Sequence, residues 1–362
     1  MKRIPNLAML TAVMLTCSMS VLAQRIQTFD ADGLPLPYAH VLNEKGNMVG
    51  STDMNGVLDD VQGAQTLHIT HITCKPKVVN VKDLGSDGRI QLEKGDFALP
   101  EVVISNKSHD WLFMETYYRM IIIRNHDEVV FCGDGIWDNY IDLKSKKRWN
   151  DYKHAVKNHK SKSPYGIVAW AQSGECQAPM YNIMARAIKK TDEPDKKIQV
   201  VKGADGQRKL VIKDKQIGYV VDEGTHRRLA IDLKELAMMT GSEKKKKKVE
   251  KIDEINDHAA NYYYDVYDTS GIEEGEPDID SFVMRQIITH GYEKKSQKPL
   301  DLIIYCYSTD RTFLAKDEVS KFKKERKTKR LTPEQLPEFT RKHNIPALDP
   351  TLQAKLSGLA KD

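Results

Sequence analysis

Turn-forming residues recur at short intervals in the first hundred residues, and they limit what this part of the chain can fold into. Glycine follows Asp, Asn or Lys at several of the turns, and the segments between them are short and rich in β-branched residues. The turns lie at Asp32-Gly33, Lys45-Gly46-Asn47, Asn55-Gly56 and Gly85-Ser86-Asp87-Gly88. Because short strands at such spacing pair through tight turns, the pattern predicts an antiparallel β-sandwich over residues 24–105.

The stretch Asp53-Met54-Asn55-Gly56 shows the expected turn chemistry. An Asp carboxylate accepts hydrogen bonds from backbone amides further along the turn, and Gly adopts positive φ without strain. A calcium site would need more oxygen ligands and the distal Glu of an EF-hand loop, which the sequence lacks. We therefore expect a turn that joins two strands.

Four stretches in this segment carry a family resemblance: residues 32–41, 51–56, 67–70 and 99–104. Together they resemble the carboxypeptidase-regulatory-like domain, a transthyretin-like β-sandwich common in cell-envelope proteins of Bacteroidetes. The resemblance implies an accessory domain that has no catalytic residues of its own and is appended to another domain of the same protein.

The N-terminus has the pattern of a secretory signal. Lys2 and Arg3 precede an apolar run over residues 7–15, and Ala23 ends a segment suited to cleavage before Gln24. The run is too short to cross a bilayer as a helix. We expect residues 1–23 to be removed and the mature chain to be exported, to the periplasm or to the outer membrane.

Export would place four cysteines where disulfides can form: Cys74, Cys132, Cys176 and Cys306. They allow three pairings, and the sequence does not choose among them. The alternative is that each is a small buried hydrophobic residue, because none shows the close spacing of a metal or redox site.

Residues 106–330 predict a larger antiparallel, β-rich α+β domain, which makes the whole chain mainly β. Gly133-Asp134-Gly135 is interpreted as a turn, and residues 227–239 as a helix, because leucines there share one helical face. Strands are expected at residues 111–124, 128–132, 136–141, 199–201, 209–213, 262–267, 282–289, 301–308 and 312–315.

Residues 331–362 predict a helical tail. Thr332-Pro333-Glu334-Gln335 has the form of a capped helix start, and Asp349-Pro350 repeats it before a leucine-containing segment. We expect two short surface helices here.

No sequence template for catalysis fits the chain, which has no GxSxG, HExxH or P-loop motif. His290 and Glu293 have the spacing of a zinc-binding pair, but chance alone supplies such a pair in a chain with this many acidic residues. His68 and His71 would point to opposite faces of a strand. The sequence therefore predicts no catalytic residue, metal or cofactor.

Four residues are candidates for facing a ligand: Tyr262, Tyr264, Asp134 and Trp137. Alternating tyrosines can line a sugar or lipid pocket, but they also form half-buried faces of sheets, where the ring packs and the hydroxyl reaches water.

Basic residues gather in two runs. Residues 244–248 are five lysines that we interpret as a solvated loop, and residues 321–330 form the second run. Phe322 gives the second run an apolar face, which suggests peripheral contact with a membrane. The basic residues expected to make that contact are Lys321, Lys323, Lys324, Arg326 and Lys327. We expect no nucleic-acid partner, because an exported protein rarely meets one.

Two hypotheses about function remain. The first is a non-enzymatic cell-envelope protein, a binding or scaffolding module that engages an envelope protein, glycan or lipid; a narrower form is a periplasmic lipid carrier of half-barrel type. The second is a hydrolase of unrecognised family that uses Asp134, Asp138 or His290.

Overall fold

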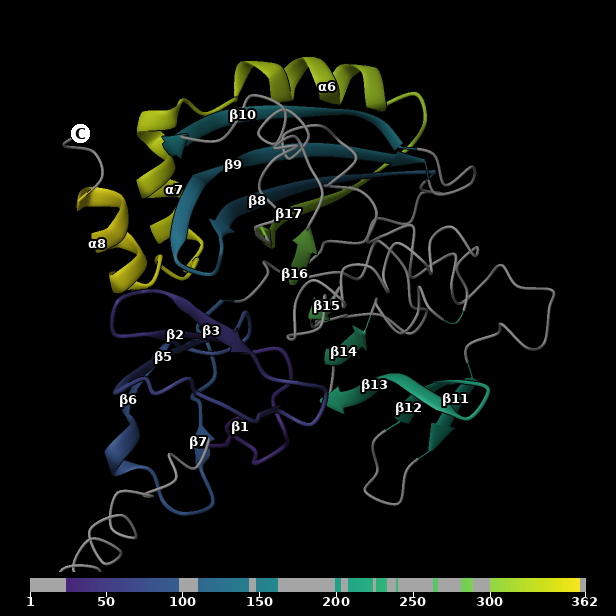
Figure 1. The fold of residues 1–362 in the computed structure, drawn as a ribbon. Helices are drawn as coiled ribbons and strands as arrows, with labels where there is room; N and C mark the ends of the chain where they lie inside the picture. The colour runs from purple at the N-terminus through teal and green to yellow at the C-terminus, as the bar shows by residue number, and fades with distance from the viewer. Residues whose placement is uncertain are drawn as a thin grey trace, which may run out of the picture.

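The fold is mainly β, with several antiparallel sheets and a few short C-terminal helices, so the predicted fold class is confirmed (Figure 1). The computed structural model describes residues 24–97, 110–142, 148–161, 199–202, 208–223, 226–232, 239, 263–265, 281–288 and 300–358. The predicted leader, the first basic run and the His290–Glu293 pair lie outside these residues. In the described part of the chain, no helix is both long enough and apolar enough to cross a membrane.

Residues 24–97 form two small sheets that share one core. The first has the order β4-β1-β7 and contains β1 (Ile26–Phe29), β4 (Val57–Leu58) and β7 (Arg89–Gln91). The second has the order β3-β2-β5-β6 and contains β2 (His40–Asn43), β3 (Met48–Ser51), β5 (Thr66–Thr70) and β6 (Lys77–Asn80). Ile26 and Ile90 of the first sheet pack with Val41 and Leu67 of the second. The β-sandwich is therefore present, with one parallel pair, β1 with β7, among antiparallel ones.

The turn at residues 53–56 has the predicted chemistry. Asp53 Oδ1 accepts hydrogen bonds from the backbone N–H groups of Asn55 (2.8 Å) and Val57 (2.7 Å). Gly56 adopts a φ of 73°, and a Cβ atom there would lie 2.5 Å from the carbonyl oxygen of Thr28 on β1. The glycine is needed both for its backbone conformation and for this close approach.

We expect Gly56→Ala to destabilise the protein more than Gly63→Ala. Both glycines have positive φ, but a Cβ atom at Gly63 would meet nothing within 4 Å. Gly63→Ala should lower the free energy of unfolding by about 1 kcal/mol because of its backbone conformation alone. At Gly56 the clash should lower it by about 1–3 kcal/mol more. Urea unfolding of both variants measures the difference, and equal midpoints would contradict the steric explanation.

The larger domain is built on one ten-stranded antiparallel sheet, in the order β10-β9-β8-β17-β16-β15-β14-β13-β12-β11. Within it an early strand, β8, pairs with the last one, β17. The strands are β8 (Trp111–Arg124), β9 (Glu128–Asp142), β10 (Arg148–Ser161), β11 (Gln199–Lys202), β12 (Arg208–Ile212), β13 (Lys215–Glu223), β14 (His226–Asp232), β15 (Tyr263–Asp265), β16 (Ser281–Ile288) and β17 (Leu300–Leu314).

The helix predicted over residues 227–239 is wrong in its first half, where β14 runs from His226 to Asp232. This segment pairs with β13 on one side and β15 on the other. Leu229 and Ile231 also alternate as a strand requires, so sheet pairing on both edges outweighs the helical spacing of the leucines.

The turn predicted at residues 133–135 is also wrong, because β9 continues through it as one strand. Gly135 serves a packing purpose instead. A Cβ atom at Gly135 would lie 2.8 Å from the Tyr118 hydroxyl oxygen, and the Tyr118 ring stacks on Trp137 at 4.5 Å. The glycine leaves room for an aromatic ring in the sheet rather than reversing the chain.

Both predicted helix starts in the C-terminal tail are confirmed. Thr332 and Gln335 form a reciprocal capping box, and the Asp349 carboxylate accepts a hydrogen bond from the Thr351 N–H at 2.9 Å. The helices are α6 (Val319–Thr328), a 3₁₀ turn η5 (Pro333–Gln335), α7 (Leu336–Lys342) and α8 (Pro350–Gly358).

These helices cover one face of strands β8 to β10 (Figure 1). Leu336 of α7 and Leu356 of α8 pack in the same core as Tyr117 of β8 and Ile136 of β9. β8 is buried along nearly its whole length. The central strands therefore lie inside the domain, and polar side chains on their covered face must find partners within the protein.

Hydrogen bonds join the sandwich to the large sheet and to helix α8. His40 Nδ1 lies 2.6 Å from the Tyr305 hydroxyl, and His68 Nδ1 lies 3.3 Å from Asp349 Oδ2 at the start of α8. Lys355 Nζ of α8 donates to Asn47 Oδ1 at 2.6 Å. Helix α8 thus contacts both the large sheet and the sandwich.

Candidate functional site

The covered face of β8 to β10 carries two polar groups among apolar side chains. Asp134 and Asp138 lie on the same face of β9 because side chains alternate along a strand, and four residues span about 13 Å. Each aspartate contacts a histidine of β10: His159 Nε2 lies 3.1 Å from Asp134, and His154 Nε2 lies 3.4 Å from Asp138. The surroundings of the two groups differ.

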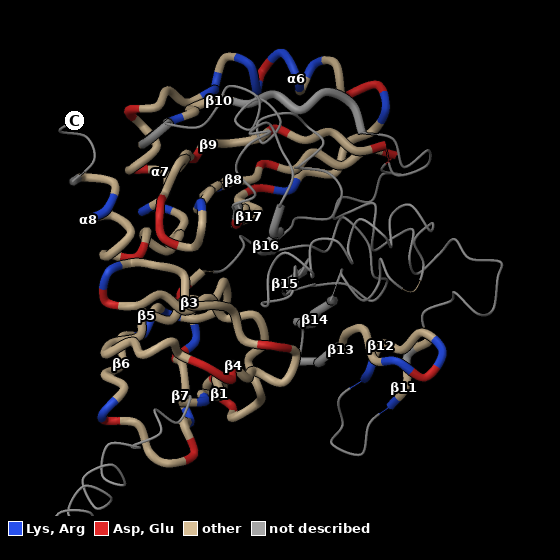
Figure 2. The backbone as a smooth tube through the Cα atoms, in the orientation of Figure 1, with Lys and Arg blue, Asp and Glu red and all other residues tan. Residues whose placement is uncertain are grey.

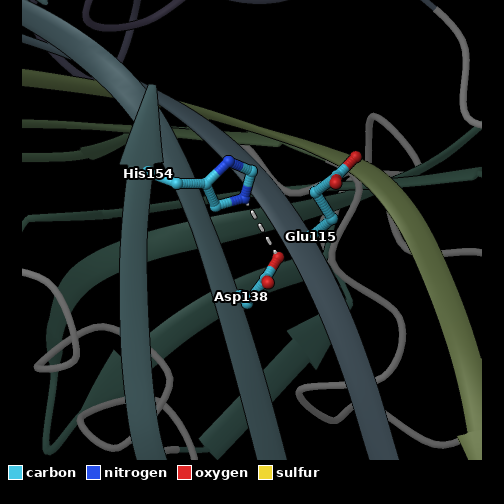
Figure 3. Close-up of side chains that lie close together, drawn as sticks. All are labelled: Glu115, Asp138 and His154. Atoms are coloured by element: carbon cyan, nitrogen blue, oxygen red, sulfur yellow. Dashed lines mark hydrogen bonds and ion pairs between the residues drawn. The ribbon is translucent and has the colours of Figure 1, made fainter. Parts of the chain in front are cut away.

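The first group joins Glu115, Asp138 and His154, which come from three neighbouring strands (Figure 3). Each residue offers one potential metal-ligand atom, and these atoms lie within 4.8 Å of one another. All three side chains are buried. Two carboxylates and one imidazole are a donor set that suits several divalent metals, so this group requires a test against metal binding.

Arg326 of α6 already occupies the position between the two carboxylates. Its Nη2 atom donates to a Glu115 carboxylate oxygen and to Asp138 Oδ1, the latter at 3.0 Å. Thr309 Oγ1 adds a hydrogen bond to Glu115 Oε1 at 3.0 Å. A metal ion would have to displace a guanidinium that balances the same charges.

The hydrogen bonds of His154 also oppose metal binding. The backbone N–H of Leu331 donates to His154 Nδ1 at 3.2 Å, so this nitrogen carries a lone pair. The proton of the neutral ring then lies on Nε2, facing Asp138. A metal-binding histidine does the reverse, because it presents a lone pair to the ion and donates its other N–H to an acceptor. The residues of this group therefore fit an internal ion-pair network better than a metal centre.

This network holds α6 on the sheet. Burial raises the pKa of Asp138, but the hydrogen bond from His154 and the charge of Arg326 outweigh it and keep that pKa below the ordinary value of 3.8. The Arg326 guanidinium also lies 4.8 Å from the centre of the Phe113 ring. The Phe322 ring, one turn earlier on α6, lies 4.9 Å from the same ring.

Arg326→Met should unfold the domain at markedly lower urea concentration. The change leaves Glu115 and Asp138 buried without their cation, which typically costs about 3–5 kcal/mol. Lys324→Met on the exposed side of α6 is the matched control and should change stability by about 0.5 kcal/mol or less. Adding Glu115→Gln and Asp138→Asn to Arg326→Met should recover part of the loss. If Arg326→Met alone were as stable as Lys324→Met, the network would be excluded as a support for α6.

The stability lost in Asp138→Asn should depend on pH. Because the pKa of Asp138 is lowered on folding, its charged form contributes stability above the unfolded pKa, and this contribution disappears as pH falls through the folded pKa. The difference between wild type and Asp138→Asn should thus be largest at neutral pH and shrink below about pH 4. Asp59→Asn, at an exposed position, is the control. Urea unfolding at a series of pH values measures both, and a constant difference would contradict the linkage.

The second group lines a pocket of about 460 Å³ between the sheet and the C-terminal helices. The sheet contributes Arg119, Cys132, Asp134, Lys157 and His159. The helical side contributes Leu336, Pro337, Thr340, Ala347, Leu348, Gln353, Leu356 and Ser357. Lys157, Pro337 and Gln353 are exposed, so the pocket reaches solvent at its rim.

Asp134 is the centre of the hydrogen bonds in this pocket. The Tyr117 hydroxyl donates to Asp134 Oδ2 at 2.9 Å, and His159 Nε2 contacts Asp134 Oδ1 at 3.1 Å. Burial, together with the charge of Asp134, raises the pKa of Tyr117 well above its ordinary value, so this hydroxyl keeps its proton and remains a donor. Both oxygens of the carboxylate therefore have a partner within the protein.

The four ligand-facing candidates from the sequence have different positions. Asp134 lines the pocket. Trp137 lies on the opposite face of β9, where it is buried and stacks on Tyr118. Tyr262 lies outside the described residues; Tyr264 lies in β15, and its side chain is outside the described part.

Three of the four cysteines are described, and each is a free, buried thiol: Cys74, Cys132 and Cys306. None of them forms a disulfide, which agrees with the alternative of small buried residues. Cys176 lies outside the described residues. Cys132 lines the pocket, where burial raises the pKa of its thiol to about 12, so it is not a thiolate nucleophile near neutral pH.

The five basic residues expected to face a membrane all lie on α6, where Figure 2 shows basic positions along the helix, but their environments differ. Lys321, Lys324 and Lys327 are exposed on α6. Lys323 is half-buried with its amine 4.6 Å from the centre of the Tyr140 ring, and Arg326 points inward to the ion-pair network. Only the three exposed lysines remain candidates for an outside partner.

Several site residues were not singled out in the sequence: Glu115, Tyr117, Arg119, His154, Lys157 and His159. The alternation along residues 111–124 and 128–142 could have placed some of them on one face. Their partners depend on the strand register and on which helix covers that face, and neither is a local property of the sequence.

No protein-family model, curated protein or solved structure matches this chain.

Proposed function

We propose that this chain is a non-enzymatic ligand-binding protein of the cell envelope, and that its ligand is a small molecule held between the large sheet and helices α7 and α8. The observation that carries the proposal is the pocket of about 460 Å³. Small-molecule sites typically measure about 300–1,000 Å³ and combine apolar walls with a few convergent polar groups.

The walls of the pocket match that description. Leu336, Leu348 and Leu356 supply apolar surface from the helical side. Arg119, Asp134 and His159 supply polar groups from the sheet. Arg119 and Asp134 pair directly across β8 and β9, and His159 lies at a register irregularity of β10. A binding site on sheet strands is held more precisely than one on loops.

The envelope location in this proposal has two supports. One is the secretory pattern of residues 1–23, and the other is the resemblance of residues 24–105 to an accessory domain of envelope proteins. The sandwich also contacts α8, which forms one wall of the pocket. A partner that binds the sandwich would thus lie close to the ligand site, as expected of a binding or scaffolding module.

A hydrolase is the second candidate, and a specific contact favours it. His159 lies 3.1 Å from Asp134 inside the pocket, and a histidine oriented by a carboxylate can act as a general base. Turnover of an ester, amide or glycoside substrate that is abolished by His159→Gln, with ligand binding retained, would favour the enzyme. Binding without turnover would favour the binding protein.

Filling the pocket should abolish binding. Ala347→Trp places a large ring at an exposed position on the pocket wall, whereas Ala354→Trp adds the same ring to α8 outside it. A metabolite library screened by thermal shift, followed by native mass spectrometry, should yield ligands for wild type and for Ala354→Trp but not for Ala347→Trp. At roughly 100 times Kd, a ligand should stabilise the protein by about 2.7 kcal/mol. Absence of any bound small molecule, or equal binding by Ala347→Trp, would contradict the proposal.

A further inference from the structure

Asp134 lies opposite two cations and pairs with neither. The register of the sheet places Arg119 of β8 and Lys157 of β10 directly across from it. Residues in such positions have Cβ atoms about 5 Å apart, close enough for an ion pair to form by default. The side chain of β10 that contacts Asp134 is His159, at 3.1 Å. Asp134 therefore acts on Arg119 only through its charge, and Lys157 lies near enough to Glu334 to lower the pKa of that carboxyl.

Other partners prevent the expected ion pair. Tyr117 and His159 contact the two oxygens of the Asp134 carboxylate, one each. The Arg119 guanidinium turns to the helical side, where its Nη1 atom donates to the Pro346 carbonyl oxygen at 2.8 Å. In the part of the chain that the structure describes, no carboxylate oxygen lies within 4.0 Å of it.

Arg119 remains a cation in this position. Burial lowers its pKa, but the neighbouring Tyr117 and Asp134 raise it by more. A guanidinium has five N–H donors, and the carbonyl of Pro346 uses one of them. The Tyr117 hydroxyl lies within hydrogen-bonding reach of the same guanidinium. Because Arg119 lines the pocket, the donors that neither Pro346 nor Tyr117 engages can meet a molecule bound there. Two parallel N–H groups of arginine match the two oxygens of a carboxylate or phosphate.

The helical side of the pocket offers hydrogen-bond acceptors, whereas Arg119 on the sheet side offers donors. The Thr340 hydroxyl donates to the Pro337 carbonyl at 3.0 Å, and the Ser357 hydroxyl donates to the Gln353 carbonyl at 2.9 Å. Each hydroxyl has one proton, so both can only accept further hydrogen bonds. These two residues suit ligand groups that donate, such as hydroxyl or amino groups.

We propose that the ligand carries a carboxylate or phosphate group, which Arg119 binds through paired hydrogen bonds, with Lys157 as a second cation at the rim and the ligand's own donors directed to the helical side. This inference rests on the proposed function, because it names the ligand class of the same pocket.

The test uses the full mature chain and a library of matched probes, each acid paired with its neutral amide or unphosphorylated analogue. Binding is measured by ligand-observed NMR for wild type, Arg119→Gln, Arg119→Lys and Arg124→Gln. Arg124 is the control, because it lies on the same strand beyond the pocket and pairs with Glu128. Thermal unfolding of each variant confirms that it is folded before its binding is compared.

Wild type and Arg124→Gln should bind acids about ten- to a hundredfold more tightly than the neutral analogues, as expected for hydrogen bonds to a charged group. Arg119→Gln should lose that preference, and Arg119→Lys should keep only part of it because a lysine lacks the paired donors. Neutral analogues that bind as well as acids, or an acid preference that survives Arg119→Gln, would overturn the inference while leaving the binding function intact. If no probe of either kind bound, the proposed function would fail as well. Whether the carboxylate probes or the phosphate probes bind shows which of the two anionic groups the ligand carries.

Discussion

The burial of both faces of strands β8 and β9 is the constraint on which the rest of this domain depends. These strands carry charged residues at Glu115 and Asp138 among apolar ones, so the segment that covers them must supply a cation as well as hydrophobic surface. Helix α6 provides both, with Phe322 against Phe113 and Arg326 between the carboxylates. The apolar and the charged contact lie one helical turn apart on α6, so the same placement of the helix makes both.

A few residues along the strands, the buried carboxylate of Asp134 on the same face has different partners. Around Asp134, a tyrosine and a histidine satisfy the carboxylate, and in the described residues the helical side meets the nearby arginine with a carbonyl oxygen rather than a carboxylate. The result is a pocket rather than a closed core. A single sheet face therefore holds a sealed ion-pair network beside an open polar site, and the difference lies in whether the covering segment contributes a charge of its own.

Local signals in the sequence predicted the parts of the fold that depend on local chemistry. The Asp53–Gly56 turn and the capping box at Thr332 were predictable because one short stretch contains all the interacting groups. The strand at residues 226–232 was not, because pairing on both edges decided it. Asp134 was singled out from the sequence, but Arg119 and His159 become neighbours only through register and the covering helices, which no local pattern encodes.

The pairing of β8 with β17 also sets the order in which this chain can fold. Tyr117 and Tyr307 are direct neighbours in the sheet although most of the large domain separates them in sequence. Such contacts carry a high loop-closure cost and form slowly. The sandwich closes over a shorter stretch of chain, since its most distant strand pair joins Gln27 to Arg89, whereas the pairing of β8 has to wait for the last strand. Until then, the unpaired backbone N–H and C=O groups on that edge of β8 can pair with other chains.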